Sequence, residues 1–345
     1  MSCLKGSKIE VALTFDDVGI VPLYSEIETR SNCNTRSRLT KNIYLNTPII
    51  ASPMDTVCGK EMAEEMDRLG GIGIIHRFNS IEDQVKELPN TKLKAAAVGS
   101  TGDWWERTQE LIKNGTGIIL IDVANGNNVN VKRVIDKIKS EYYGIDIIAG
   151  NVCTEEGARN LCEWGVDAVR AGIGGGSLCS TRKNTAIGVP QITALDWCMK
   201  ACEEYDVPLI SDGGVRYVGD ICKAIGIGAE TVMLGSLLAG TKESPGSIKK
   251  TGEWPNEQLF KSYRGSASLE NKIVHGLVEK HVEGASKIIP YKGKVERIIN
   301  DILDGLKSSM SYVNANNIPT FIKNCSFVQV TQAGQIEATP HLLNS

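Results

Sequence analysis

The sequence has no long hydrophobic run and no excess of charge of either sign. No apolar stretch approaches the roughly 18 residues of a membrane-spanning helix, and the N-terminal segment MSCLKGSKIE lacks the apolar core of a signal peptide. The 38 Lys and Arg residues nearly balance the 41 Asp and Glu residues, for a formal net charge of −3. We therefore expect no membrane span, no surface for membranes or nucleic acids, and a cytoplasmic location.

Paired cysteines are also missing. The ten cysteines are scattered without a Cys-x-x-Cys motif, and no group of His, Cys, Asp and Glu has the spacing of a zinc site. In a reducing compartment most cysteines serve as small buried hydrophobic residues. We predict this for eight or nine of the ten, including Cys153, Cys162, Cys198, Cys202 and Cys222, and we predict no transition metal.

A repeating unit fills most of the chain: a short apolar run, a polar turn and a helical pattern. The predicted strands are 48–55, 70–77, 94–100, 117–126, 146–152, 168–177, 208–214 and 230–236. The predicted helices between them are 59–69, 80–88, 103–114, 129–142, 154–164, 191–205 and 217–227. Ser80, Asp103 and Thr154 are the expected N-caps of three of these helices.

This alternation predicts the fold class. Near-continuous apolar strands that alternate with amphipathic helices are typical of a parallel sheet covered by helices. Eight units within about 190 residues favour a (β/α)8 TIM barrel over an open doubly wound sheet, and no Gly-x-Gly-x-x-Gly motif follows the first strand. We expect one barrel domain over 1–345, with an N-terminal arm at 1–47, a mobile flap or insertion at 243–291 and a C-terminal tail at 331–345.

The glycine-rich loop after the sixth predicted strand is the most informative segment. Residues 168–191 read AVRAGIGGGSLCSTRKNTAIGVPQ, with Ser177 two residues before Cys179. Glycines let backbone N–H groups approach an anion closely, and a cysteine in such a loop can act as a nucleophile where its thiolate is favoured. The loop therefore predicts anion binding and covalent chemistry side by side.

Polar residues recur where the predicted strands end, which is where a barrel of this kind carries its active site. They are Ser52, Asp55, His76, Arg77, Ser100, Asp122, Asn125, Asn151, Ser177, Cys179, Asp212 and Ser236. Glycines follow the seventh and eighth strands, the usual phosphate-binding positions of such barrels. We therefore expect a phosphorylated small molecule there, with Cys179 near its reactive end.

Two of these strand-end residues have open roles. His76 is either a general base or a structural histidine, and Asp122 is either a ligand-binding group or a charge partner in the barrel mouth. A monovalent cation held by backbone carbonyls would leave no side-chain signature in the sequence.

Several segments, in order, resemble the IMP dehydrogenase/GMP reductase family. They are ASPMDTV (51–57), GGIGIIHR (70–77), IDVANG (121–126), IAGNV (148–152), GIGGGSLCSTRKNTAIGVPQ (172–191), ISDGG (210–214), VMLGS (232–236) and YRG (263–265). The resemblance covers roughly residues 13–331. It implies a (β/α)8 barrel, a homotetramer, and a purine nucleotide bound covalently at C2 through a cysteine.

Within this family the sequence is most similar to the reductase branch. It lacks the CBS insert common in dehydrogenases, and its segment 263–283, YRGSASLENKIVHGLVEKHVE, lacks the Arg-Tyr pair that activates water in dehydrogenases. The segments VEGASKIIPYKG and SSMSYVNA are also similar to reductases. A dehydrogenase without CBS domains, which would convert IMP to XMP with NAD, stays an alternative, since VTQAGQIE (330–337) resembles that branch in part. The alternative of a different class is a purine-nucleotide-binding barrel without turnover.

The resemblance implies an NADPH-dependent deamination of GMP to IMP, with release of ammonia, through a thioimidate on Cys179. The implied catalytic residues are Cys179, Thr181, Glu283 and Arg77. The implied nucleotide-binding residues are Ser52, Met54, Ser177, Asp212, Gly213, Gly214, Gly235, Ser236, Gly265, Ser266 and Ala267. The implied cofactor-binding residues are Asp122, Val123 and Ala124. The implied potassium ligands are the backbone carbonyls of Gly174, Gly176, Cys179 and Arg182. Arg77, Arg170 and Gly175 depart from the Lys, Lys and Pro common in reductases.

Overall fold

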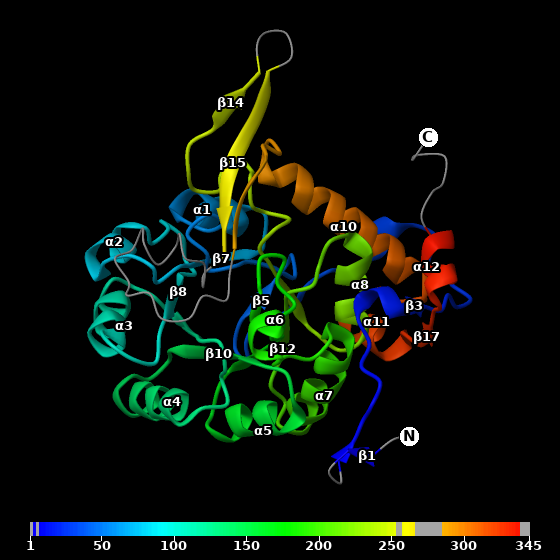
Figure 1. Ribbon diagram of the computed structural model, residues 1–345, viewed down its shortest axis with the longest axis horizontal. Helices are drawn as coiled ribbons and strands as arrows, with labels where there is room; N and C mark the ends of the chain where they lie inside the picture. The colour runs from blue at the N-terminus through cyan, green and yellow to red at the C-terminus, as the bar shows by residue number, and fades with distance from the viewer. Residues whose placement is uncertain (1–2, 5–6, 253–256, 266–284, 339–345) are drawn as a thin grey trace.

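The centre of the molecule is a closed barrel of eight parallel strands (Figure 1). This computed structural model describes residues 3–4, 7–252, 257–265 and 285–338. The barrel strands are β6 (Ile49–Ala51), β7 (Ile72–Ile75), β8 (Ala95–Val98), β9 (Ile118–Asp122), β10 (Asp146–Val152), β11 (Ala168–Ala171), β12 (Leu209–Asp212) and β13 (Thr231–Leu234). They follow one another in chain order around the barrel, and β13 pairs with β6 to close it. The predicted (β/α)8 fold and all eight predicted strands are confirmed.

Helices surround the strands as a ring (Figure 1). Those between successive strands include α1 (Lys60–Arg68), α2 (Ile81–Lys86), α3 (Trp104–Lys113), α4 (Val129–Glu141), α5 (Glu155–Glu163), α7 (Gln191–Glu204) and α8 (Val218–Gly226). They confirm the seven predicted helices. After the barrel come α10 (Val295–Tyr312), α11 (Ile318–Asn324) and α12 (Gln332–Glu337), and α6 (Thr181–Thr185) is a short helix in the cysteine loop.

All three predicted N-cap residues occupy the N-cap positions of their helices. The Ser80 hydroxyl accepts from the Asp83 N–H, and the Thr154 hydroxyl accepts from the Gly157 N–H. Asp103 makes no capping side-chain bond. Its carboxylate instead pairs with Arg107 one turn later, at 2.7 Å.

The barrel strands are buried on both faces, which explains their near-continuous apolar sequences. One cluster fills the barrel interior and contains Ile50, Ile74 and Leu120, together with Leu39 and Leu45 from the segment before the barrel. Alternate strand residues belong instead to the larger cluster under the helices. This alternation turns every second side chain at the strand ends toward the barrel mouth.

The cysteines are unpaired wherever the structure describes them. Cys33, Cys58, Cys153, Cys162, Cys198, Cys202 and Cys222 are buried. Cys325 is half-buried and Cys179 is exposed. The five cysteines named from the sequence as buried hydrophobic residues are therefore confirmed as such, and Cys179 stands apart from all of them.

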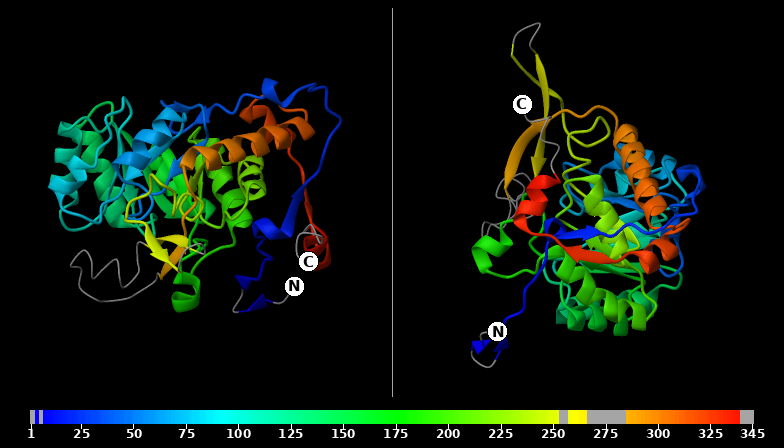
Figure 2. Two further views of the ribbon diagram at one scale, coloured as in Figure 1. Left: turned by 90° about the horizontal axis from the view of Figure 1, so that it is seen from above. Right: turned by 90° about the vertical axis from the view of Figure 1, so that its right-hand side faces the viewer.

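Four short sheets lie outside the barrel in the described residues. In the predicted flap, β14 (Lys249–Thr251), β15 (Gln258–Arg264) and β16 (Ser286–Pro290) form an antiparallel sheet that projects from the barrel in both views of Figure 2. Near the N-terminus β1 (Cys3–Leu4) pairs with β2 (Ser7–Lys8), and β3 (Val18–Ile20) pairs with β17 (Phe327–Gln329). In addition, β4 (Ser37–Arg38) pairs with β5 (Tyr44–Leu45). The boundaries of arm, flap and tail stay predictions.

Across the described residues, no helix is both long and apolar enough to cross a membrane. Within the same residues, no group of three or more His, Cys, Asp or Glu side chains is arranged to hold a metal ion.

Candidate functional site

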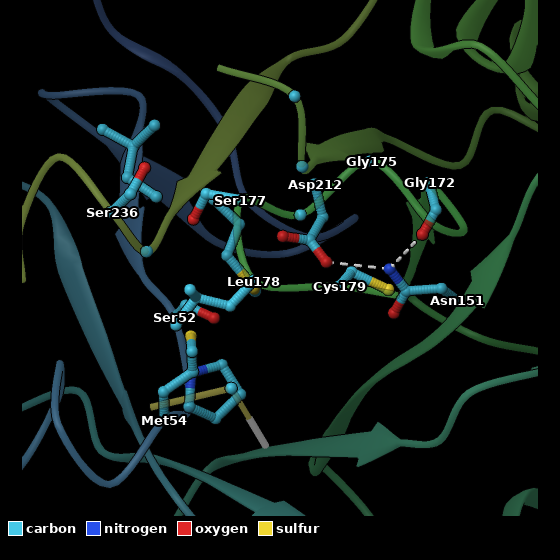
Figure 3. A pocket seen from close by; sticks show the side chains of 18 of the residues that line it. Ser52, Met54, Asn151, Gly172, Gly175, Ser177, Leu178, Cys179, Asp212 and Ser236 are labelled. Carbon is cyan, nitrogen blue, oxygen red and sulfur yellow. Dashed lines mark hydrogen bonds between the residues drawn. The ribbon is translucent and has the colours of Figure 1, made fainter. Parts of the chain in front are cut away.

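A cavity of about 710 Å³ opens at the C-terminal ends of the barrel strands (Figure 3). It brings together almost every described residue that the sequence predicted for the site. Those in its wall are Ser52, Met54, Arg77, Asp122, Val123, Ala124, Gly174, Gly176, Ser177, Cys179, Thr181, Asp212, Gly213, Gly214, Gly235, Ser236 and Gly265. Arg182 is described but lies outside this wall. Ser266, Ala267 and Glu283 lie outside the described residues.

Cys179 is the exposed thiol of this wall. It sits in the loop between β11 and α6, where its backbone N–H donates to the Gly176 carbonyl at 3.0 Å. Its Sγ lies 3.1 Å from the Thr181 Oγ1. A nucleophilic sulfur next to a hydroxyl that can exchange a proton is the arrangement that covalent catalysis requires.

The cysteine loop is also held by the sheet beyond the barrel. The Ala285 N–H donates to the Leu178 carbonyl at 3.0 Å, and the Gly265 N–H donates to the Ala285 carbonyl at 2.9 Å. The two ends of the segment 265–285 therefore meet directly beside Cys179.

The glycine loops after β11 and β12 lie against each other. A Cβ placed on Gly213 would lie 3.2 Å from the Gly175 carbonyl carbon, and Gly213 has a positive φ of 97°. Glycine is needed at this position because a side chain would meet both strain and backbone. The close approach gathers backbone N–H groups on one side of the cavity, as an anion site needs.

Tyr263, from β15, completes this side of the cavity and was missed in the sequence. Its hydroxyl lies 3.1 Å from the Ser177 Oγ, and a Cβ on Gly235 would lie 3.1 Å from the same hydroxyl. Burial raises the pKa of the Tyr263 phenol, so it stays a neutral hydrogen-bond donor. The sequence signal for this residue was the YRG segment (263–265), which resembles the family. The resemblance implied no role for Tyr263 itself.

A network of charged residues forms the opposite part of the cavity. The buried Arg170 reaches Asp122 at 2.5 Å and Asp212 at 2.9 Å. Asn151 donates to the same oxygen of Asp212 at 2.8 Å and to the Gly172 carbonyl at 2.6 Å (Figure 3). Burial alone would lower the pKa of Arg170, but Asp212 and Asp122 outweigh it and raise that pKa, so the guanidinium keeps its charge.

The open roles of two strand-end residues become clearer. Asp122 is a charge partner in the barrel mouth, as one alternative proposed, and it also lines the cavity. His76 is buried outside the cavity wall, and its Nδ1 accepts from the Phe78 N–H at 3.2 Å. This geometry favours the structural role for His76.

Other strand-end residues take part less directly. Asp55 lies outside the wall and pairs with Arg264 at 2.5 Å, at the base of the β14–β15–β16 sheet. Ser100 and Asn125 also lie outside the wall. The loop after β9 is fixed by its backbone, since the Val123 N–H donates to the Gly150 carbonyl and the Val123 carbonyl accepts from the Asn151 N–H.

The predicted potassium ligands form a compact turn of the cysteine loop. The Gly176 and Arg182 carbonyls each accept one N–H, from Cys179 and Ala186. Each carbonyl oxygen has a second lone pair. A Cβ on Gly174 would lie 2.6 Å from the Arg182 Cγ, so the two ends of the turn touch. Backbone oxygens are the ligands that a hard cation prefers, and potassium binding by these carbonyls stays a prediction.

Comparisons with known proteins agree with the fold and the site. A family model described as "IMP dehydrogenase / GMP reductase domain" matches residues 12–341. The inosine-5′-monophosphate dehydrogenase of Cryptosporidium parvum is 35% identical over 388 residues, which cover 95% of this chain and 94% of that protein. The enzyme of the same name from Borreliella burgdorferi is 36% identical over 398 residues, with 96% of each covered.

A solved structure is similar over the whole fold. It is a cysteine-to-alanine variant of a GMP reductase from Trypanosoma brucei, in complex with guanosine 5′-monophosphate. The TM-score is 0.90 at 28% sequence identity, and the match covers 96% of this chain and 98% of that one. Similar proteins thus carry names from both branches.

Proposed function

The chain belongs to the IMP dehydrogenase/GMP reductase family of oxidoreductases, and from that premise we propose that it is a GMP reductase. Enzymes of this family act on purine nucleotides with a nicotinamide cofactor. The proposed reaction is the NADPH-dependent deamination of GMP to IMP with release of ammonia. The 3.1 Å pair of Cys179 Sγ and Thr181 Oγ1 in the cavity wall supports the covalent step that both family reactions share. The observation that carries the choice of the reductase is the sequence of segment 263–283, which has no Arg-Tyr pair to activate water and ends at Glu283.

Cys179 is the proposed nucleophile. Its thiolate attacks C2 of the purine, and the bond from C2 to the exocyclic nitrogen breaks. Because an amide anion is a very poor leaving group, the departing nitrogen has to be protonated. Thr181 relays that proton, with Glu283 as its proposed source, and ammonia is released.

The second half of the reaction resolves the adduct. When bound, NADPH supplies a hydride to C2. The C2–S bond then breaks, Cys179 leaves as a thiolate and IMP is formed. Asp122, Val123 and Ala124 are proposed to hold the cofactor beside the cysteine loop, and Arg77 lies next to Asp122, with its Nε 3.7 Å from the carboxylate.

The nucleotide is proposed to lie with its phosphate on the glycine side of the cavity. Ser177, Gly213, Gly214, Gly235 and Ser236 would bind the phosphate through N–H and hydroxyl groups. Further proposed contacts come from Ser52, Met54, Asp212, Gly265, Ser266 and Ala267. A potassium ion would be held by carbonyls of Gly174, Gly176, Cys179 and Arg182 and would stabilise the turn of the cysteine loop. A homotetramer and a cytoplasmic location complete the proposal.

Product identification tests this proposal. The protein is incubated with GMP and NADPH, and nucleotides and ammonium are quantified over time. We expect IMP and ammonium to appear in equal amounts, each matched by one NADPH consumed. If no IMP forms and the amounts of GMP and NADPH stay unchanged, the proposal is wrong.

A CBS-free IMP dehydrogenase is the second candidate. The names of the two relatives at 35% and 36% identity favour it. Against it stands the segment 263–283, whose sequence has no Arg-Tyr pair to activate water. Incubation with IMP and NAD separates the two, because only a dehydrogenase forms XMP.

A further inference from the structure

We infer that Arg170 is a positioning residue that sets two carboxylates at once: Asp212 for the ribose hydroxyls of the nucleotide and Asp122 for the cofactor. The inference rests on the proposed binding of a purine nucleotide and a dinucleotide in this cavity. It does not depend on which of the two family reactions the protein performs.

The bonds around Asp212 leave one oxygen for a ligand. Arg170 donates to Oδ2 through Nε at 3.0 Å and lies within 2.9 Å of it through Nη2. Asn151 donates to the same Oδ2 at 2.8 Å. No hydrogen bond from the described residues falls on Oδ1. Because Asp212 lines the cavity, Oδ1 is the acceptor available to a hydroxyl of the bound ligand.

The other end of the guanidinium holds Asp122 in the same way. Arg170 Nη1 donates to Asp122 Oδ1 at 2.5 Å. The second oxygen, Oδ2, lies 3.7 Å from Arg77 Nε, and Asp122 also lines the cavity. One planar fork therefore binds one oxygen of each carboxylate, and the second oxygen of each accepts no hydrogen bond from the described residues.

Arginine is a side chain that can do this, because its donors diverge in one rigid plane. Without the cation the two acidic groups would face each other across a poorly hydrated space, where like charges repel strongly. The positioning effect therefore depends on the charge of this side chain and on its donors to both carboxylates.

The backbone leaves Arg170 little freedom to shift. Its residue is 6% exposed and lies in β11, between β10 and β12. A Cβ on Gly150 of β10 would lie 2.5 Å from the Arg170 carbonyl oxygen and 2.7 Å from the Arg170 Cβ. Arg170 therefore projects from a rigid part of the barrel. A residue that positions other side chains needs such a rigid support.

Arg170→Gln is the test, because it keeps an amide donor but removes the charge, and Arg107→Gln is its matched control. Arg107 is 5% exposed and bonded to Gln84, Asp103 and the Asn79 carbonyl, but it does not line the cavity. Arg170→Gln is expected to raise the KM of both the nucleotide and the dinucleotide by about tenfold, the scale of one charge-assisted hydrogen bond. Arg107→Gln is expected to lower the Tm and leave both KM values unchanged.

Ligands without ribose hydroxyls separate positioning from general damage. Dissociation constants of the wild type and both variants are measured for GMP, IMP and their 2′,3′-dideoxy forms. Arg170→Gln is expected to weaken binding of the two ribonucleotides about tenfold and binding of the dideoxy forms by less than about twofold. Equal loss for both ligand types, or a pattern like that of Arg107→Gln, would overturn the inference.

Two further results keep the inference testable. Should Arg170→Gln fail to fold, Asp122→Asn takes its place. It frees one edge of the guanidinium and should weaken binding of the ribonucleotide at Asp212, on the other edge; an unchanged affinity would contradict the coupling. Should the wild type bind neither nucleotide, this inference and the proposed function both fall. Should it bind both and form XMP, only the reductase assignment falls.

Discussion

The Sγ of Cys179 and the Oγ1 of Thr181 lie 3.1 Å apart in the wall of the cavity. The thiol is exposed, and seven of the other cysteines are buried. A proton can therefore pass between the thiol and the hydroxyl without a bridging water, and both groups face the space where a ligand binds.

Replacing the nucleophile should separate binding from chemistry. Cys179→Ala removes the sulfur but no charge or large volume, so the cavity should still bind the nucleotide. We expect turnover to fall below detection, with the dissociation constant of GMP within about threefold of the wild-type value. Turnover and equilibrium binding are measured on the same preparation. Residual turnover near the wild-type rate would contradict the covalent mechanism.

The neighbouring hydroxyl should matter for rate more than for affinity. Thr181→Ala is expected to lower kcat by about 10²–10⁴-fold, the usual contribution of a positioned proton donor, and to change KM little. Thr181→Ser keeps the hydroxyl and serves as the matched control, with most of the activity restored. If alanine and serine variants lose activity equally, the methyl group and not the hydroxyl is what the site requires.

Tyr263 should act on the phosphate side of the nucleotide. Its hydroxyl lies 3.1 Å from the Ser177 Oγ, so Tyr263→Phe removes one partner of a buried polar pair. We expect KM for GMP to rise about fivefold, the cost of roughly one hydrogen bond, with kcat nearly unchanged. Competition by guanosine, which has no phosphate, supplies the control: its inhibition constant should not move. An equal rise in the inhibition constant of guanosine would mean that Tyr263 acts on the nucleoside part of the ligand and not on its phosphate.

Thiol labelling should single out Cys179. Burial raises the pKa of Cys222 to about 11 and that of Cys325 to about 12, so these groups are protonated at neutral pH as well as shielded. Brief treatment with iodoacetamide at pH 7, followed by peptide mass spectrometry, should find Cys179 alkylated before the other eight cysteines of the described chain. GMP should slow the reaction. Faster labelling of a buried cysteine would mean that the helices open more readily than the packing indicates.

The barrel could be predicted from the sequence because its strands are buried. Strands such as Ile118–Asp122 are covered on both faces, so they stand out as short continuous apolar runs between amphipathic helices. Asp103 takes the predicted N-cap position, but a sequence does not reveal that its carboxylate pairs with Arg107 instead of capping the helix. Local patterns thus identified the elements but not the partner chosen by a charged side chain.

The sequence predicted the residues of the cavity only where they are contiguous in the chain. The cysteine loop, the pair Gly213 and Gly214 after β12, and Gly235 with Ser236 after β13 carry their own signals. Arg170 gave none of a functional kind, because it sits inside an apolar strand and its partners are 42 and 48 residues away. Tyr263 meets Ser177 across 86 residues. Such contacts depend on which side of a strand faces the barrel mouth, and that is fixed by the closed fold.

Nicotinamide absorbance, followed in two directions with one preparation, is the most direct test of the reductase assignment. One cuvette holds the protein with GMP and NADPH, and the other holds it with IMP and NAD, both with potassium present. Oxidation of NADPH in the first cuvette and no change in the second is the predicted result. Reduction of NAD in the second cuvette, with the first unchanged, would contradict it.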